Sequence, residues 1–312
     1  MIPKLYGICG PTASGKTELA LRLCERLGGE IISADSMQVY RGMDILSAKP
    51  DADELKRAKH HVIDFVPPDE NYNASRFRQD AMAAIQTVNE KHALPILCGG
   101  TGLYIDALTK GIRMAEEADQ ELRERLKGIA AQPDGKYRLH RMLKEVDPAS
   151  AAKYPINDTR RVIRSLEIFY ATGKPRGEHE QEDAQSECTF DAVLFALKWD
   201  RETLYRRIDR RVDDMVARGL ISEVKALLNA PEAVRETAAQ AIGFKELKQA
   251  LEGEISMDEA IDLTKTHSRH LAKRQETWFK RDRRVTWLET DGTNFDALTQ
   301  SIADIISEAI AR

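Results

Sequence analysis

A short segment near the N-terminus constrains the fold more than any other part of the chain. It reads Gly10-Pro11-Thr12-Ala13-Ser14-Gly15-Lys16-Thr17 and matches the pattern G-x-x-x-x-G-K-[ST]. An apolar run at residues 5–9 precedes it and a helical pattern at 16–27 follows, which is the strand–loop–helix context that phosphate binding requires. Backbone amides of such a loop surround phosphate oxygens, while Lys16 supplies positive charge and Thr17 can hold Mg²⁺. The segment therefore predicts a site for a phosphate or a diphosphate.

Strand and helix patterns alternate after this loop. Apolar, β-branched runs at residues 30–34, 61–65 and 94–98 are separated by helical patterns, and a further strand pattern returns at 192–199. This alternation is typical of parallel βαβ units, so we expect an α/β fold with a P-loop NTPase-like parallel sheet and helices on both faces. The remainder of the chain is mostly helical, with one last strand pattern at 284–288, and it predicts a helical C-terminal region.

The strand pattern is absent from a long middle segment. Residues 113–189 hold amphipathic helical patterns broken by proline-containing turns, and an acidic stretch at 178–191 has the composition of a linker. We therefore predict an inserted all-helical domain at 113–189. The α/β core with the C-terminal helices would then be formed by residues 1–112 and 190–312.

Composition limits the class of protein. Hydrophobic residues make up 42% of the 312 residues and charged residues 31%, so the chain can bury a core and is neither disordered nor membrane-spanning. The N-terminus has no signal-peptide pattern, and we expect a cytoplasmic protein. The four cysteines form no C-x-x-C pair, which argues against a zinc site or a disulfide framework.

The net charge of −4 argues, taken alone, against a partner as acidic as a nucleic acid. The charge is unevenly distributed, however: residues 265–284 carry eight Lys or Arg against two acids, and residues 201–211 carry five Arg against two acids. Such basic segments can meet RNA phosphates despite the negative total. Within the second segment Arg207 and Arg211 share one helix face, where guanidinium groups suit diphosphate oxygens; a solvated helix face is the alternative for the other arginines.

Polar residues follow two of the predicted strands at the same sheet edge as the phosphate loop. Asp35 comes directly after the strand at 30–34, and Gly99-Gly100-Thr101-Gly102 follows the strand at 94–98. Ligands of open α/β sheets bind along this edge, so Asp35 could ligate a metal or accept a proton, and Thr101 could contact a leaving group. A turn cap and a glycine turn without a ligand are the alternatives. The glycine-terminated strand lacks the Asp that nucleotide hydrolases carry, which favours a transferase.

With these residues in view, the chain resembles the tRNA dimethylallyltransferases (tRNA isopentenyltransferases, the IPP transferase family) over nearly its whole length. The resemblance rests on the phosphate loop and on a highly specific run, Asp35-Ser36-Met37-Gln38-Val39-Tyr40-Arg41-Gly42-Met43-Asp44. Shorter motifs support it: Gly99-Gly100-Thr101-Gly102-Leu103-Tyr104, Asn157-Asp158 with Arg160-Arg161, Thr172-Gly173-Lys174-Pro175, Gln240-Ala241-Ile242-Gly243-Phe244-Lys245-Glu246-Leu247, and Lys273-Arg274-Gln275 with Trp278-Phe279. The chain has no C-terminal Cys/His zinc module and so is similar to the shorter, bacterial type.

The resemblance implies transfer of a dimethylallyl group from dimethylallyl diphosphate to N6 of adenosine 37 in tRNA, with release of diphosphate. The phosphate loop would hold the prenyl diphosphate, with Mg²⁺ at Thr17. Asp35 would be the base for the adenine amine and Thr101 would contact diphosphate oxygen. Lys16 and Arg211 would stabilise the negative charge of the leaving group.

The same resemblance implies the tRNA anticodon stem-loop as a partner of the protein, which we expect to be a monomer. It assigns tRNA contacts to residues of both predicted domains: Asp35, Ser36, Met37, Gln38, Thr101, Arg123, Thr159, Arg160, Arg161, Val162, Gln240 and Lys245. One departure from the family pattern is Leu46-Ser47, which stands where the family reads Gly-Thr. Ser47 retains a hydroxyl, whereas the glycine is missing.

Three other functions remain as alternatives. A small-molecule P-loop kinase shares the loop and predicts ADP release. An adenylate isopentenyltransferase acting on free AMP or ADP shares the chemistry but would not need the long basic C-terminal helix. A non-catalytic RNA-binding regulator would bind tRNA without turnover. Prenyl transfer onto tRNA, and its dependence on Asp35, separates these alternatives from the function that the resemblance implies.

Overall fold

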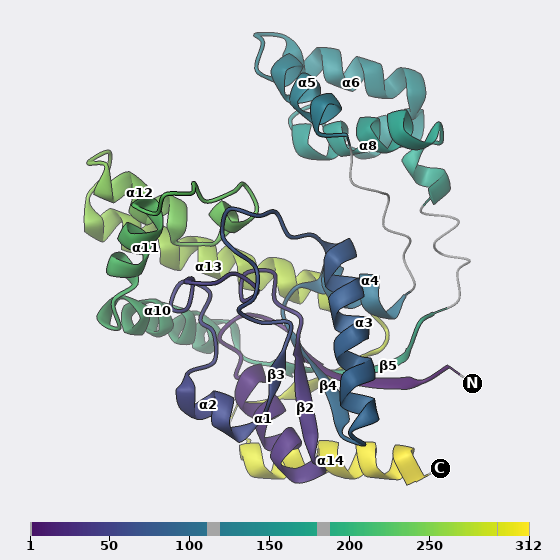
Figure 1. Ribbon diagram of the computed structural model, residues 1–312, viewed down its shortest axis with the longest axis vertical. Coiled ribbons are helices and arrows are strands. Elements are labelled where there is room, and N and C mark those ends of the chain that lie inside the picture. The colour runs from purple at the N-terminus through teal and green to yellow at the C-terminus, as the bar shows by residue number, and fades with distance from the viewer. Residues whose placement is uncertain (1, 111–118, 180–187, 292, 312) are drawn as a thin grey trace. The chain divides into compact units, whose positions relative to one another are not determined.

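The computed structural model describes residues 2–110, 119–179, 188–291 and 293–311 (Figure 1). The chain divides into two compact units: unit 1 comprises Met1–Thr109 and Phe190–Arg312, and unit 2 comprises Lys110–Thr189. Most of the predicted acidic linker at 178–191 lies outside the described residues.

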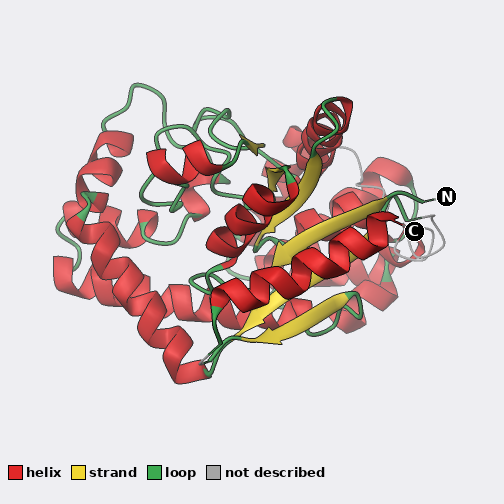
Figure 2. Cartoon of the chain, turned by 90° about the horizontal axis from the view of Figure 1, so that it is seen from below, coloured by secondary structure: helices red, strands yellow, loops and turns green. Residues whose placement is uncertain are grey.

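A six-stranded parallel sheet forms the centre of unit 1 and confirms the predicted α/β fold (Figure 2). The strand order is β3-β2-β4-β1-β5-β6, with every pairing parallel. The strands are β1 Lys4–Cys9, β2 Gly29–Ser33, β3 His60–His61, β4 Leu94–Gly99, β5 Asp191–Lys198 and β6 Val285–Glu289. Because all six run the same way, their carboxyl ends meet at one edge, where ligands of such sheets bind.

Helices cover both faces of the sheet. The helices of unit 1 are α1 Lys16–Leu27, α2 Ala52–Arg57, α3 Ala74–Glu90, α4 Gly102–Thr109, α10 Arg201–Ala217, α11 Leu220–Leu228, α12 Phe244–Leu251, α13 Met257–Phe279 and α14 Phe295–Ala311. Tyr6 and Ile8 of β1 share one core with side chains of α1 and α14. Their neighbour Leu5 is also buried but belongs to the other face, because successive strand residues point to opposite sides. The buried side of α3, which includes Phe77, covers that second face.

The third strand is shorter than the sequence predicts. A strand was expected over 61–65, yet β3 ends at His61. Val62 and Asp64 have φ of 58° and 57°, in the left-handed region, and this ends the extended backbone. The following residues pair instead with the loop after β2, because the Phe65 and Val66 amides donate to the Val39 carbonyl at 3.0 and 2.9 Å. The loop that follows Asp35 is thereby tied to the sheet.

Unit 2 is a small helical domain with its own core. Its helices include α5 Gln120–Ala130, α6 Gly135–Val146, α7 Pro148–Lys153 and α8 Thr159–Thr172. Leu126, Leu139 and Leu166 come from three of these helices and are fully buried together. Burying each such side chain is worth about 1.5–3 kcal/mol, which lets a unit of this size hold together.

Candidate active site at the carboxyl edge of the sheet

The phosphate loop joins β1 to α1 at the carboxyl edge of the sheet. Gly10 and Gly15 have φ of +123° and +97°, conformations that favour glycine. Among the described residues, no hydrogen bond engages the amides of Ala13, Ser14 and Gly15, and α1 begins directly after them at Lys16. The loop therefore presents consecutive N–H donors at a helix N-terminus, which is the arrangement that binds phosphate.

Two arginines of α10 lie on this loop. Arg207 Nε donates to the Ala13 carbonyl at 2.9 Å, and Arg211 Nη1 donates to Thr12 Oγ1 at 3.2 Å. The two arginines are four residues apart, so their side chains leave the same face of the helix. That shared face, expected from the sequence, is directed at the phosphate loop.

Trp199, just before α10, fixes the helix against the loop. Its Nε1 donates to the Ser14 carbonyl at 2.8 Å, and the Arg207 guanidinium lies 4.4 Å from its ring centroid. The other arginines of the segment do not share this role. Arg206 is exposed and lies 4.0 Å from Glu202 of its own helix, while Arg210 lines the cleft described below.

Lys16 and Arg211 are half-buried next to the phosphate loop. Burial lowers the pKa of the Lys16 amine, while Cys98 and Asp35 act in the opposite direction. Burial also lowers the pKa of the Arg211 guanidinium, again against an opposing effect of Asp35. Lys16 Nζ makes a long hydrogen bond of 3.4 Å to the Pro11 carbonyl. A bound anion would stabilise the charged form of both half-buried cations.

A cleft of about 470 Å³ opens beside the loop and is bordered by α10 and the segment around Ala48. Among the described residues, six cations line it against three carboxylates. The charged lining consists of Lys16, Lys49, Arg207, Arg210, Arg211, Arg218, Glu18, Glu54 and Asp214. This balance favours a ligand with several negative charges, such as a diphosphate.

The segments that contain Asp35 and Thr101 meet at the ends of β2 and β4. Asp35 Oδ1 accepts a hydrogen bond from the Met37 amide at 2.9 Å. Thr101 Oγ1 accepts one from the Ser36 amide at 3.0 Å and lies 3.3 Å from Ser36 Oγ. A Cβ at Gly99 would lie 2.1 Å from the Ala34 carbonyl oxygen, so glycine is required for the two strand ends to approach. The two strand ends are therefore in direct contact, through Ala34 and Ser36 on one side and Thr101 on the other.

A glutamine of α13 also reaches this edge, although no sequence pattern indicated a role for it beyond family resemblance. Gln275 Oε1 accepts from the Thr12 amide at 2.8 Å, and Gln275 Nε2 donates to the Gly100 carbonyl at 3.0 Å. Its partners are 263 and 175 residues away in the chain. Local patterns carry no information on contacts over such separations.

The donor set of the cleft fits Mg²⁺ held mainly by a substrate. Among the described residues, no group of three or more His, Cys, Asp or Glu side chains is arranged to enclose a metal ion. Mg²⁺ commonly needs no such cage, since it takes one or two protein oxygens together with phosphate oxygens and water. Thr17 and Glu54 line the cleft and provide oxygens of this kind, whereas the Glu18 carboxylate is already paired with Arg22 and Arg57.

The residues of unit 1 that were predicted to contact tRNA have different surroundings. Gln38 is engaged inside its loop, because Ser33 Oγ donates to its Oε1 at 3.0 Å and its Nε2 donates to the Ala48 carbonyl at 3.1 Å. Gln240 Nε2 donates to the Glu236 carbonyl at 3.3 Å. Lys245 is exposed on α12. These positions leave Lys245 accessible, whereas Gln38 shapes the loop after Asp35.

The predicted tRNA contacts of unit 2 lie on α5 and α8. Arg123 forms a two-pronged ion pair with Glu167, at 2.7 and 3.1 Å. Arg160 and Arg161 are exposed on the first turn of α8. Val162 is 1% exposed and belongs to the core of the unit, so its side chain cannot contact a ligand at the surface. Thr159 at the start of this helix is half-buried, and Arg161 pairs with Asp158 at 2.7 Å, so the polar groups of this stretch that face solvent belong to residues 159–161.

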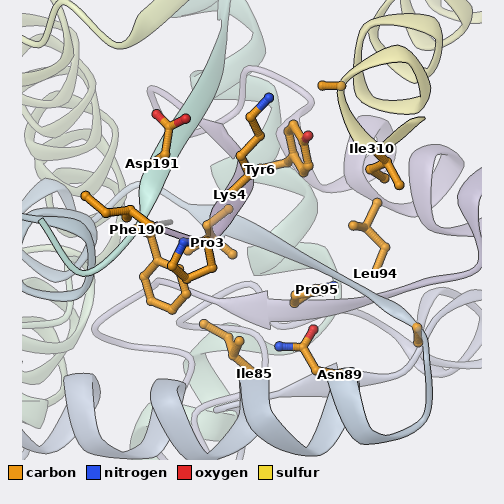
Figure 3. A pocket seen from close by; sticks show the side chains of 14 residues that line it. Pro3, Lys4, Tyr6, Ile85, Asn89, Leu94, Pro95, Phe190, Asp191 and Ile310 are labelled. Atoms are coloured by element: carbon orange, nitrogen blue, oxygen red, sulfur yellow. The ribbon is translucent and has the colours of Figure 1, made fainter. Parts of the chain in front are cut away.

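A second hollow lies at the opposite, amino ends of the strands (Figure 3). It has a volume of about 590 Å³ and is lined mainly by apolar side chains such as Ile85, Leu94 and Ile310. None of the residues predicted for the site lines it. Its place at the amino ends of β1 and β4 separates it from the phosphate loop.

Comparison with known proteins gives one consistent family. The family model described as IPP transferase matches residues 38–282. A tRNA dimethylallyltransferase of Pelotomaculum thermopropionicum is 44% identical over 301 residues, which cover 96% of this chain and 95% of that protein. One of Geobacter metallireducens is 43% identical over 299 residues, covering 96% of each chain.

Solved structures show the same likeness. A tRNA isopentenylpyrophosphate transferase from Bacillus halodurans is 41% identical, with a TM-score of 0.72 over 98% of this chain and 96% of that one. A eukaryotic dimethylallyltransferase described as acting on tRNA is 32% identical, with a TM-score of 0.83 over 99% of this chain and 79% of that one.

In the part of the chain that the structure describes, no helix is long and apolar enough to cross a membrane.

Proposed function

The chain belongs to the IPP transferase family, and we propose that it transfers a dimethylallyl group from dimethylallyl diphosphate to N6 of adenosine 37 in tRNA. The observation that carries the proposal is the convergence of a phosphate loop, Asp35 and Thr101 at one sheet edge. A phosphate cradle alone would suit many enzymes. A carboxylate and a hydroxyl at its border, in a chain of this family, suit prenyl transfer to an amine.

The leaving group of this reaction is a diphosphate. When its bond to the allylic carbon breaks, the bond electrons stay on oxygen and negative charge grows there. Lys16, Arg211 and the loop amides after Thr12 would stabilise that charge without reorganising. Mg²⁺ bound with Thr17 would neutralise further charge on the diphosphate. Thr101 Oγ1 would donate its hydrogen to a diphosphate oxygen near the cleaved bond.

The acceptor is an exocyclic amine that must lose a proton once its nitrogen bonds to the prenyl carbon. Asp35 follows β2 at the same sheet edge as the phosphate loop, and its negative charge opposes the lowering of the pKa of both Lys16 and Arg211, which supports a role beside the phosphate site. It would accept a hydrogen bond from the amine and finally its proton. The target base has to leave its stack to reach this edge, as for other enzymes that modify bases.

The tRNA would contact both units. In unit 1 we assign this role to Ser36 and Met37, next to the base site, and to Lys245 on α12. In unit 2 we assign it to Arg160 and Arg161, which are exposed at the start of α8. Basic side chains of this kind bind phosphate groups and position the RNA without reading its sequence. We further propose that a monomer in the cytoplasm carries out the reaction.

One assay tests the proposal directly. The purified protein is incubated with dimethylallyl diphosphate, Mg²⁺ and unmodified tRNA, and the tRNA is digested and analysed by nucleoside mass spectrometry. We expect an adenosine carrying one dimethylallyl group, and none when adenosine 37 is replaced by guanosine. Omitting Mg²⁺ should strongly reduce the yield.

Parallel reactions separate the alternatives. In one reaction, free AMP or ADP replaces tRNA as the acceptor. In another reaction, ATP replaces dimethylallyl diphosphate as the donor. Prenylated AMP or ADP formed faster than prenylated tRNA would indicate an adenylate isopentenyltransferase. Release of ADP without prenyl transfer would indicate a kinase, and tRNA binding without either product would indicate a non-catalytic protein.

A further inference from the structure

Gln275 adds a side-chain link between two neighbouring loops of the site, which follow the paired ends of β1 and β4 at Cys9 and Gly99. Its carboxamide accepts from the Thr12 amide of the phosphate loop and donates to the Gly100 carbonyl, next to Thr101. The two bonds, at 2.8 and 3.0 Å, have good hydrogen-bond lengths. A carboxamide has both a donor and an acceptor at its tip, which is what this position requires.

The glycines of the second loop are matched to α13. A Cβ at Gly100 would lie 2.2 Å from Gln275 Nε2, and a Cβ at Gly102 would lie 2.4 Å from Trp278 Cδ1. Side chains at these positions would displace the helix. The backbone on either side of Thr101 is therefore held by direct contact with α13.

We propose that Gln275 is a positioning residue for the transfer reaction, which holds the phosphate loop and the Thr101 loop in register. This inference rests on the function proposed above. Thr12 is fixed from two sides, because Gln275 takes its amide and Arg211 contacts its hydroxyl. Thr101 lies one residue beyond the Gly100 carbonyl that Gln275 binds. A shift of about 1 Å between reacting groups can lower the rate by roughly 10²-fold.

Other contacts hold α13 in place without Gln275. Lys265 pairs with Asp213 of α10 at 2.6 Å. Trp278 Nε1 donates to Asp106 of α4 at 3.1 Å. Loss of the Gln275 carboxamide should thus leave the helix docked and free only the two loops.

The test compares Gln275→Met with Glu276→Met. Methionine has nearly the shape of glutamine but cannot form either hydrogen bond. Glu276 lies on the same helix and pairs with Lys280 at 2.7 Å. Each variant is assayed for steady-state prenylation of tRNA, and calorimetric titration with inorganic diphosphate counts the competent sites.

We expect kcat of Gln275→Met to fall by about 10- to 100-fold while the number of diphosphate sites per chain equals that of the wild type. Glu276→Met should keep the wild-type kcat. The inference is overturned if both variants have the same kcat. It is also overturned if Gln275→Met has fewer diphosphate sites per chain and its kcat, calculated per competent site, equals that of the wild type. A wild-type protein that transfers no prenyl group would instead refute the proposed function.

Discussion

At the level of single residues, Asp35 has a structural role in the turn after β2 and a chemical role in the reaction that we propose. One carboxylate oxygen accepts from the Met37 amide at 2.9 Å and shapes the turn after β2. Among the described residues, no hydrogen bond engages its other oxygen. Asp35 therefore caps the turn, as one of the two interpretations of the sequence predicts, and its second carboxylate oxygen is still available to a substrate. A carboxylate can serve both purposes because it has two oxygens.

Replacing Asp35 by asparagine separates these roles. The amide oxygen of Asp35→Asn can still accept from Met37, whereas the basic oxygen is lost. We expect kcat for prenyl transfer to fall by about 10²–10⁴-fold. Binding of tRNA, measured by filter retention, should change little. Asp53→Asn, an exposed change on α2, serves as the control. If Asp35→Asn had the turnover of the wild type, Asp35 would be excluded as the base.

At the scale of elements, α11 holds the turn that follows the Asp35 segment. The Glu223 carboxylate accepts from the amides of Asp44, Ile45 and Leu46, at 2.9, 2.8 and 2.7 Å. The Ser47 hydroxyl donates to the Met43 carbonyl at 2.5 Å, so serine supplies the hydroxyl expected at that position.

The same turn explains the departure from the family pattern. Leu46 does not have the positive φ that would require a glycine. Its side chain is buried, and a Cβ at Gly243 would lie 3.1 Å from its Cδ1. Leu46 thus packs against the backbone of the segment that contains Gln240 and Lys245. Leucine is accommodated here because a glycine stands opposite.

Glu223→Ala should weaken this arrangement. Three backbone amides would lose their acceptor, and we expect the free energy of unfolding to fall by about 1–3 kcal/mol. The turn leads to Lys49, which lines the cleft, so KM for the prenyl diphosphate should also rise. Urea unfolding and steady-state kinetics measure the two effects. The control Lys225→Ala changes an exposed residue of the same helix and should alter neither the unfolding free energy nor KM. An unchanged unfolding free energy in Glu223→Ala would contradict the interpretation.

At the scale of the whole molecule, the net charge of −4 hides a separation of charge along the chain. Four of the eight basic residues at 265–284 are paired within unit 1: Lys265 with Asp213, Arg269 with Asp209, Lys280 with Glu276, and Arg284 with Asp282. The remaining four are exposed, and no ion pair with any described residue involves them: Lys273, Arg274, Arg281 and Arg283. Within the segment 265–284, these four are the cations that we expect to meet RNA phosphates.

This separation predicts salt-dependent tRNA binding. The double variant Lys273→Ala/Arg274→Ala removes two exposed cations and should weaken tRNA binding. The slope of log K against log salt concentration should also become shallower, by about one for each phosphate that is no longer neutralised. The control Lys59→Ala/Lys91→Ala removes equal charge at the amino ends of β3 and β4 and should leave the slope unchanged. Filter binding at several salt concentrations gives both slopes. Equal slopes for the two double variants would show that 273 and 274 do not contact tRNA.

Features that depend on neighbouring residues could be predicted from the amino-acid sequence alone. The phosphate loop, helix α1 and the parallel α/β fold follow from local patterns, because loop geometry and hydrophobic periodicity are encoded over a few residues. Short elements such as α4, α11 and α12 were not predicted, and β3 ended early, because tertiary contacts override weak local preference there. Only the tertiary structure brought Arg211, Gln275 and Glu223 to their loops. Their partners are 175 or more residues away, and hydrogen bonds over such separations form only when the whole sheet edge is assembled.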